Sequence, residues 1–222
     1  MKAITFAGLE IHIDEAEKYL QIDNSSESAL RAAWPLISSN YPGYEIFFVY
    51  NSNEAPAGLM NEIGAKQVGN CHEMRLQRKD IPFSLPPNIV EVTEENYDVF
   101  AAYHNENMPP HFGWTSKKIK QDMSRWSIFM SQADGQVNGY ILTRVRSPDY
   151  ADIYNIECED LTTGKLLMTA AVSHAFELGK PEIQFMADVN SPEEEIASAL
   201  GFEVKGFYLE YKIDLPGTAS QG

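Results

Sequence analysis

A strand, a short helix and a glycine turn follow one another in the stretch EIQFMADVNSPEEEIASALGF (residues 182–202). Its alternating apolar residues predict a strand over Glu182–Asn190. Ser191 is a typical helix N-cap, proline follows at the first helical position, and Glu194 stands three residues after the cap. The short helix ends before Gly201, because glycine readily takes the left-handed conformation that closes a helix.

One helix and three strands precede this stretch. Apolar and small residues recur at helical spacing and predict a helix over Lys165–Leu178. Apolar segments separated by turn signals predict three strands, Trp126–Ala133, Val137–Arg146 and Asp152–Glu159. Consecutive strands joined by short turns favour an antiparallel meander.

The remaining elements lie on either side. Ile89–Val92 predicts a short strand, Thr93 is a candidate cap for a helix behind it, and a second helix is expected from Ser116 to Arg125. Phe202–Leu215 predicts one or two closing strands. This order predicts an α/β (α+β) fold with a mixed, mostly antiparallel sheet flanked by helices.

The N-terminal part repeats the C-terminal pattern when it is shifted by 137 residues without a gap. The matched pairs are Ile4 and Ile141, Leu30 and Leu167, Ala33 and Ala170, Glu45 and Glu182, Ile46 and Ile183, Phe48 and Phe185, Asn53 and Asn190, Gly64 and Gly201, Gly69 and Gly206, and Glu73 and Glu210. We therefore predict a half-domain over residues 1–80, a proline-rich linker over 81–88 and a complete domain over 89–222. The alternative is a chance resemblance of two β-α-β-α-β segments.

Composition restricts the partners. The net charge of −15 disfavours nucleic acid and favours a cationic amine, unless the acidic surface serves only solubility. The two cysteines, Cys71 and Cys158, provide neither a disulfide framework nor a metal site. No apolar run reaches the ~18 residues of a membrane span, and no signal peptide is evident, so we expect a cytoplasmic protein without membrane contact.

Two motifs carry a family resemblance. Asn190 is followed eleven positions later by Gly201-Phe202, and Thr162-x-Gly164-x-x-Leu167 stands at a strand-to-helix junction. With the order of elements, these motifs make residues 89–215 resemble the GNAT superfamily of N-acyltransferases, and the whole chain resembles a tandem form with an N-terminal half-domain. The resemblance implies transfer of an acetyl or other acyl group from acetyl-CoA, or another acyl-CoA, to a primary amine of a small molecule or peptide.

The alternative function is a catalytically degenerate protein of the same fold, which binds acyl-CoA or regulates a partner. Two departures from the family favour that alternative. Leu161 stands where the family has an arginine or glutamine, and Ala197 stands where it has a general-acid tyrosine. A monomer or a homodimer fits either function.

The junction ahead of the Lys165–Leu178 helix is the candidate diphosphate site. A helix N-terminus offers unpaired N–H groups and the positive end of a dipole. The resemblance assigns this site to Leu161, Thr162, Thr163, Gly164 and Lys165. The alternative is an ordinary helix cap, and the acidic Glu159 and Asp160 oppose phosphate binding.

The resemblance also implies that the Asp152–Glu159 and Glu182–Asn190 strands separate and hold the pantetheine arm of the donor between them. The backbones of Ile156, Glu157 and Cys158 would line this slot, and Asn190 would contact the arm from the neighbouring strand. Otherwise, Asn190 is a cap or turn residue and Cys158 is a structural thiol.

Acyl transfer to an amine requires a base, which a carboxylate can supply directly or through water. Glu157 is the preferred candidate, and Glu159 lies on the same face of its strand. Tyr208 or Tyr211 is the candidate proton donor to the leaving thiolate, which can also leave unaided because a thiol pKa lies near 8.5.

An aromatic loop follows the first helix of the complete domain. By resemblance, His111, Phe112 and Trp114 face the acceptor amine, although a hydrophobic plug under a loop would have the same composition. His104 and His174 fall on helical stripes, and we expect both in the core or at its boundary.

Overall fold

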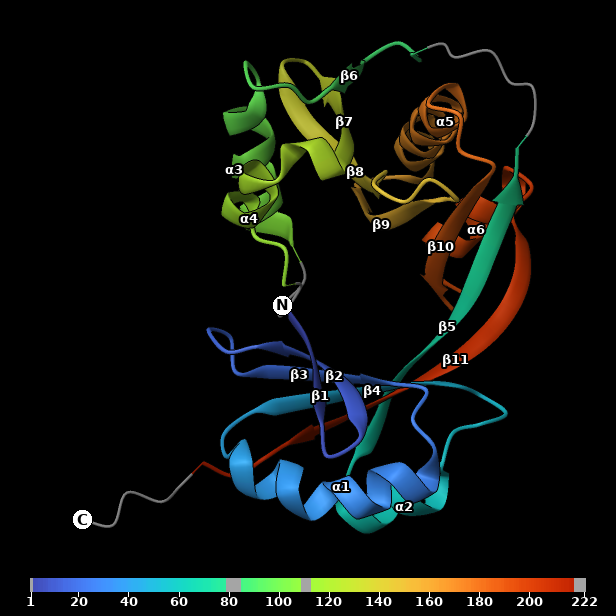
Figure 1. Cartoon of the computed structure of the whole chain (residues 1–222). Coiled ribbons are helices and arrows are strands. Elements are labelled where there is room, and N and C mark those ends of the chain that lie inside the picture. The colour runs from blue at the N-terminus through green and yellow to red at the C-terminus, as the bar shows by residue number, and fades with distance from the viewer. Residues whose placement is uncertain (1, 79–84, 109–112, 218–222) are drawn as a thin grey trace. The chain divides into compact units, whose positions relative to one another are not determined.

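The structure is a computed structural model that describes residues 2–78, 85–108 and 113–217 (Figure 1). It divides into two compact units. The first comprises the residues up to Cys71 and the segment from Gly206 onward, and the second comprises His72–Lys205. Both unit boundaries fall inside strands, namely β5 (Lys66–Gln77) and β11 (Glu203–Asp214). Of the expected linker, residues 81–84 lie outside the described residues.

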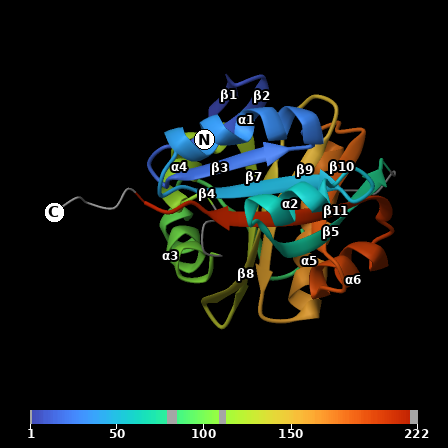
Figure 2. The same ribbon diagram turned by 90° about the horizontal axis from the view of Figure 1, so that it is seen from below.

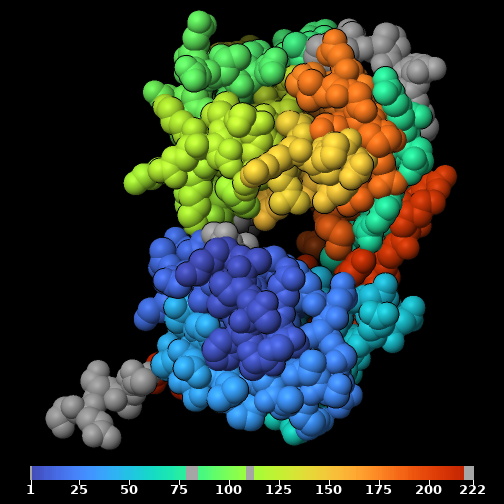
Figure 3. Space-filling model, viewed as in Figure 1, coloured from blue at the N-terminus to red at the C-terminus, as the bar shows by residue number. Residues whose placement is uncertain are grey.

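The first unit contains the strands β1-β2-β3-β4-β11 in this order, the first part of β5 next to β11, and two helices. Its elements are β1 (Lys2–Phe6), β2 (Leu9–Asp14), β3 (Tyr19–Asp23), α1 (Glu27–Asn40), β4 (Glu45–Asn51) and α2 (Ala57–Ile63), completed by β11. β3 and β4 are parallel and are connected through α1, whereas β11 runs antiparallel to β4. The edge strand β1 lies at the surface, dark blue in Figure 3.

The core of this unit lies between its strands and its two helices, which lie in front of the strands in Figure 2. Ile46, Phe48 and Tyr50 alternate along β4 and are fully buried. Leu30 and Ile37 are buried on one face of α1, as amphipathic helix spacing requires.

The second unit contains a sheet in the order β5-β10-β9-β8-β7-β6. Its elements are β6 (Ile89–Glu91), α3 (Tyr97–Asn107), α4 (Ser116–Gln121), a 3-10 turn (Met123–Arg125), β7 (Trp126–Ala133), β8 (Gln136–Arg144), β9 (Ala151–Cys158), α5 (Leu161–Glu177), β10 (Glu182–Asp188) and α6 (Pro192–Ala199). Strands β6 to β9 pair antiparallel, and β9 pairs parallel with β10. The predicted mixed, mostly antiparallel sheet flanked by helices is confirmed.

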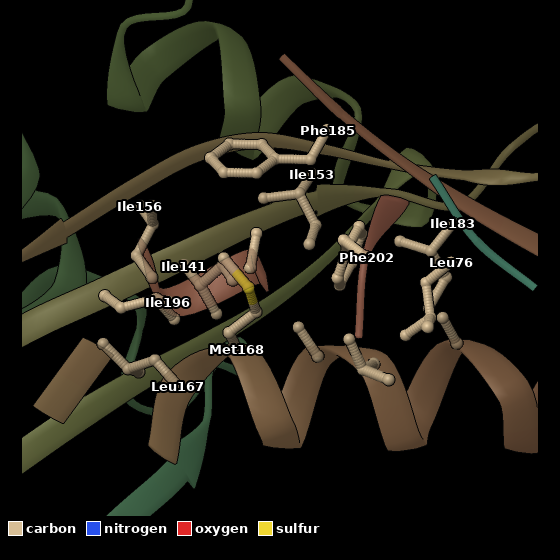
Figure 4. Close-up of a cluster of buried hydrophobic side chains, with 14 of the residues drawn as sticks. Leu76, Ile141, Ile153, Ile156, Leu167, Met168, Ile183, Phe185, Ile196 and Phe202 are labelled. Carbon is tan, nitrogen blue, oxygen red and sulfur yellow. The ribbon is translucent and has the colours of Figure 1, made fainter. Parts of the chain in front are cut away.

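Both faces of this sheet are buried along β7 and β8, where residues at successive positions point to opposite sides. On β7, Ile128 belongs to the cluster under α3 and α4, and Phe129 belongs to the cluster under α5 and α6. In Figure 4, Leu167 and Met168 of α5 lie against Ile141 of β8. The second unit is thus a helix–sheet–helix sandwich with β9 inside its sheet.

Several element ends differ from the prediction. Helix α3 begins at Tyr97 rather than behind Thr93, because the Asn96 side chain accepts a hydrogen bond from the Thr93 N–H (2.7 Å) and donates one to the Glu91 carbonyl (2.9 Å). This side-chain bridge holds the chain in a turn that competes with helix. The helix expected from Ser116 to Arg125 is interrupted after Gln121.

The predicted cap of α6 is confirmed. The Ser191 side chain accepts a hydrogen bond from the Glu194 N–H (3.1 Å), and Gly201 has a φ of +89°. Glu203–Asp214 forms one continuous strand. No helix in the described part of the chain is long and apolar enough to cross a membrane.

Candidate functional site

A bulge in β9 shapes the candidate site. β8 and β9 pair through Thr143 with Ile153 and then through Leu142 with Asn155, which leaves Tyr154 as an extra residue on β9. A bulge of this kind bends its strand and increases the local twist. Within the described part of the chain, β9 pairs with the strand on its other side only ahead of this bulge.

The strand on that side is β10, which lies beside β9 in Figure 1. Parallel pairing joins Ala151–Ile153 to Ile183–Phe185, and no further pair of these two strands is found among the described residues. A cavity of about 250 Å³ opens where the pairing stops. It is lined by Tyr154, Asn155, Ile156 and Glu157 of β9, Phe185, Met186, Ala187 and Asp188 of β10, and Glu193 of α6. The two strands thus separate as expected, and we call the space between them the strand cavity.

Three carboxyl groups line the strand cavity: those of Glu157, Asp188 and Glu193. Burial raises the pKa of Glu157, and the charge of Glu193 raises it further. The pKa of Asp188 is raised by the same two causes in the same order. Both groups therefore hold a proton more readily than an exposed carboxylate, as a general base near neutral pH requires.

A second cavity of about 290 Å³ lies between α3 and β9, and we call it the helix cavity. It is lined by Tyr103, Glu106 and Asn107 of α3 and by Glu157, Cys158 and Glu159 of the β9 end. Burial raises the pKa of Tyr103, with further contributions from the charges of Glu159 and Glu157. Glu157 lines both the strand cavity and the helix cavity.

A buried chain of hydrogen bonds supports β9 from behind. Asn155 Nδ2 donates to the Tyr140 hydroxyl (2.7 Å), which lies 2.9 Å from His104 Nδ1. His104 Nε2 is 2.9 Å from the Trp114 carbonyl oxygen. Because a carbonyl only accepts, Nε2 donates and Nδ1 of the neutral ring accepts from Tyr140. Burial lowers the pKa of His104, so this neutral ring is structural, as the sequence predicted.

Trp114 is an aromatic residue of the expected loop that the structure describes, and it contacts aromatic side chains near the strand cavity. Its ring makes edge contacts with Trp126 (5.0 Å between centroids) and Tyr154 (6.3 Å). Trp114 is only partly buried, so one part of it remains open to solvent. His111 and Phe112 lie outside the described residues.

The expected diphosphate site has a different local structure from the prediction. Helix α5 begins at Leu161, so Thr162, Thr163 and Gly164 form its first turn rather than a loop ahead of it. The Asp160 carboxylate caps this turn and accepts the N–H groups of Thr162 (2.8 Å) and Thr163 (2.9 Å). The amides of Thr162 and Thr163, which the resemblance directs at a diphosphate, thus donate to an acidic N-cap, which is the alternative that the sequence left open.

Gly164 is a packing position. A Cβ atom there would lie 2.4 Å from Ile196 Cδ1 and 2.9 Å from Cys158 Sγ, so only glycine lets α5, α6 and β9 approach this closely. Gly164, which the resemblance assigned to the diphosphate site, thus packs against the protein's own side chains. Burial raises the pKa of Cys158 to about 11, which keeps it a thiol at neutral pH.

The other predicted site residues are dispersed. Leu161, Thr162 and Lys165 are exposed at the start of α5, and Ile156 is buried beside the strand cavity. Asn190 lies beyond the end of β10 with a φ of +63°, and its N–H donates to Glu194 Oε2 (2.6 Å). It is a turn residue, and the strand predicted to reach it ends at Asp188.

The candidate proton donors lie on β11 in the first unit. Tyr208 is opposite Asn51 of β4, and Tyr211 is buried in the core of that unit. Neither lines the strand cavity, whereas Tyr154 does. Burial raises the pKa of Tyr154, so its hydroxyl keeps its proton at neutral pH.

Sequence reasoning missed ten residues that line the two cavities: Tyr103, Glu106, Asn107, Tyr154, Asn155, Phe185, Met186, Ala187, Asp188 and Glu193. Asp188 could have been found from strand alternation, since it lies two positions from Met186 on the predicted strand. The α3 residues could not, because their approach to β9 depends on how the helix packs.

Comparison with known proteins gives the fold. No protein-family model matches the chain, and no curated protein matches it in sequence. Among solved structures, a GCN5-related N-acetyltransferase from Sphaerobacter thermophilus superposes with a TM-score of 0.68 at 13% identity, covering 94% of this chain and 76% of the other. One from Kribbella flavida gives a TM-score of 0.62 at 13% identity, covering 97% and 90%.

A tandem GNAT protein from the clavulanic acid biosynthesis pathway also superposes, with a TM-score of 0.61 at 14% identity, covering 95% of this chain and 79% of the other. At such low sequence identity, the structural similarity shows the fold but not the reaction. The chain has the fold of the GCN5-related N-acetyltransferases.

Proposed function

We propose that this protein is an N-acyltransferase that moves an acyl group from the thioester of a pantetheine arm to a primary amine. The observation that carries the proposal is the separation of β9 and β10 beyond the Ile153–Phe185 pair, which opens the strand cavity inside a sheet. A backbone edge exposed inside a sheet can pair with an extended ligand that carries amide groups. Acetyl-CoA or another acyl-CoA carries such an arm.

The residues fit the two parts of an acyl-CoA unequally. Ile156, Phe185 and Ala187 give the strand cavity apolar walls, and the free side of β9 supplies backbone donors and acceptors for the arm. At the first turn of α5, the N–H groups of Thr162 and Thr163 already donate to the Asp160 carboxylate, so they are not available to the diphosphate. The arm therefore carries the proposed donor binding.

Glu157 is the proposed general base. It lines the strand cavity, where the thioester would lie, and the helix cavity, from which the amine would enter. The raised pKa of its carboxyl suits it to take a proton from the attacking nitrogen. The C–N bond of the amide then forms as the C–S bond of the thioester breaks, and Tyr154, which belongs to the lining of the strand cavity, donates a proton from its hydroxyl group to the departing thiolate.

The helix cavity suits a cationic acceptor. Glu106, Glu157 and Glu159 bring carboxyl groups to it, and Tyr103 adds an aromatic ring that can face an ammonium group. Trp114, which contacts Tyr154, is the described member of the predicted acceptor loop. We propose an acceptor that arrives as a primary ammonium on a small molecule or peptide.

We propose further that the chain is a tandem form. At the shift of 137 residues, β4 (Glu45–Asn51) coincides with β10 (Glu182–Asp188), and β5 (Lys66–Gln77) coincides with β11 (Glu203–Asp214). Coinciding element bounds support duplication of one unit more strongly than scattered identities do.

Release of free thiol from acetyl-CoA with a panel of primary amines tests the function. The Glu157→Gln variant keeps the shape of the side chain and removes the base, so the rate should fall about 10²- to 10⁴-fold. Glu177→Gln is the matched control, because Glu177 is exposed at the end of α5 and should leave the rate unchanged. Donor binding without thiol release for any amine would instead identify a binding or regulatory protein.

A further inference from the structure

The first turn of α5 is capped by a carboxylate of the protein itself, that of Asp160. Asp160 Oδ1 accepts the N–H groups of Thr162 (2.8 Å) and Thr163 (2.9 Å), and Oδ2 accepts the Thr163 hydroxyl (2.9 Å). These hydrogen bonds, with those from Thr163 the largest contribution, lower the pKa of Asp160. The group is therefore ionised at neutral pH and sits where the helix dipole favours negative charge.

Binding of a diphosphate at the same turn would be unfavourable. The Gly164 N–H is also used, since it donates to the Asp160 carbonyl (3.0 Å). A diphosphate placed at this turn would have to displace the carboxylate and would then lie beside two negative charges, those of Glu159 and Asp160. The space beside Gly164 that a Cβ atom would occupy is filled by Ile196 and Cys158.

The strand cavity does not depend on this turn. Its walls belong to β9, β10 and α6, and none of its lining residues belongs to α5. An uncharged arm of methylene and amide groups would bury carbon against Ile156 and Phe185 and would pair with the free side of β9. The structure thus favours one part of a thioester donor and opposes the other.

We propose that Asp160 determines donor specificity: it excludes the diphosphate from the α5 turn, so the site selects a thioester on a pantetheine arm and gains nothing from the attached nucleotide. This inference rests on the proposed N-acyltransferase function. It makes the donor class acyl-pantetheine, whether the arm is free or continues into a larger carrier that keeps its charge away from Asp160.

Isothermal titration with acetyl-CoA and with S-acetylpantetheine measures the two contributions separately. The wild type should bind both with dissociation constants within about threefold, a difference below 1 kcal/mol. Asp160→Gly frees two N–H groups and removes a charge, so it should tighten acetyl-CoA about tenfold, as expected for hydrogen bonds to a charged group. Its affinity for S-acetylpantetheine should not change.

Two further variants keep the test independent of folding. Asp160→Asn retains a capping side chain and removes only the charge, so acetyl-CoA should tighten by a smaller factor than in Asp160→Gly. Ser26→Gly removes the N-cap of α1, where Ser26 accepts the Ala29 N–H (3.2 Å), and should alter neither affinity. Far-UV circular dichroism reports whether each variant is folded.

The possible results separate the two proposals. A wild type that binds acetyl-CoA about tenfold or more tightly than S-acetylpantetheine, with no gain in Asp160→Gly, overturns the role of Asp160 and leaves the acyltransferase proposal intact. If neither thioester binds to the folded wild type or to either Asp160 variant, the acyltransferase proposal fails, and the specificity proposal fails with it.

Discussion

Gly164 shows how a single residue can be misassigned from a motif. The family loop suggests a glycine that admits a phosphate, whereas here its missing Cβ admits Ile196 and Cys158. Gly164→Ala should therefore destabilise the protein, because overpacking costs about 1–3 kcal/mol and exceeds the gain of up to about 1 kcal/mol in helix propensity. The measurement is the free energy of unfolding in urea.

A second helical glycine provides the control for this prediction. Gly58 also lies near the start of its helix, α2, and a Cβ atom there would meet nothing within 4 Å. Gly58→Ala should thus be neutral or stabilising. Adding Ile196→Val to Gly164→Ala removes the methyl group at 2.4 Å and should restore part of the loss. A stabilising Gly164→Ala would contradict the packing role.

The protonation of His104 should make the stability of the protein depend on pH. Burial lowers its pKa from the ordinary 6.5, so the unfolded chain binds a proton at this histidine more readily than the folded protein does. The free energy of unfolding should consequently fall as pH drops below about 6.5 toward the lowered value. Glu157 and Asp188 have raised pKa values and act in the opposite direction, so a difference measurement is needed.

That measurement compares the wild type with His104→Gln across pH 5 to 7.5, by urea unfolding. Glutamine can still donate to the Trp114 carbonyl and accept from Tyr140, but it does not titrate. The variant should lose the part of the pH slope that His104 contributes. Parallel curves for the two proteins would show that His104 titrates alike in the folded and unfolded states.

At the scale of elements, the sequence predicted what local pattern controls. β7 has the predicted bounds, and α6 has its predicted cap and closing glycine, because apolar alternation, Ser191 and Gly201 act within a few residues. The start of α5 was wrong by four residues. The apolar stripe begins later than the helix, and the Asp160 cap extends the helix backward through a polar turn.

The site depends on features that no local pattern reveals. The bulge at Tyr154 exists only as a mismatch between β8 and β9, so it cannot be read from either strand alone. The pairing of β9 with β10 ends at Ile153, next to this bulge, and the strand cavity opens there. Tyr103 and Glu106 reach the β9 end through the packing of α3, which the sequence leaves undetermined.

At the scale of the whole molecule, the repeat and the units do not share boundaries. In the proposed repeat at a shift of 137 residues, β5 closes the first copy and β11 closes the second. In the structure, however, β11 pairs with β4 from Tyr208–Asn51 to Asp214–Glu45, and Tyr211 lies in the core of the first unit. Met74 and Leu76 of β5 lie in the core of the second unit, so each unit is completed by the other copy's last strand.

This exchange predicts that neither copy folds alone. A fragment of residues 1–78 lacks β11, which leaves the β4 edge unpaired and the core without Tyr211 and Leu215, side chains whose burial contributes about 1.5–3 kcal/mol each. A fragment of residues 85–222 lacks Met74 and Leu76 in the same way. Since a domain is stable by only about 5–15 kcal/mol, far-UV circular dichroism should show both fragments unfolded or only partly folded.

When the two fragments are mixed in denaturant and the denaturant is then removed, they should restore the native spectrum and elute together in size-exclusion chromatography. A full chain cleaved at a protease site placed in the expected linker is the control, and its two pieces should stay associated until denaturant is added. Cooperative thermal unfolding of the 1–78 fragment by itself would show that β11 is dispensable, and the exchange would then not hold the molecule together.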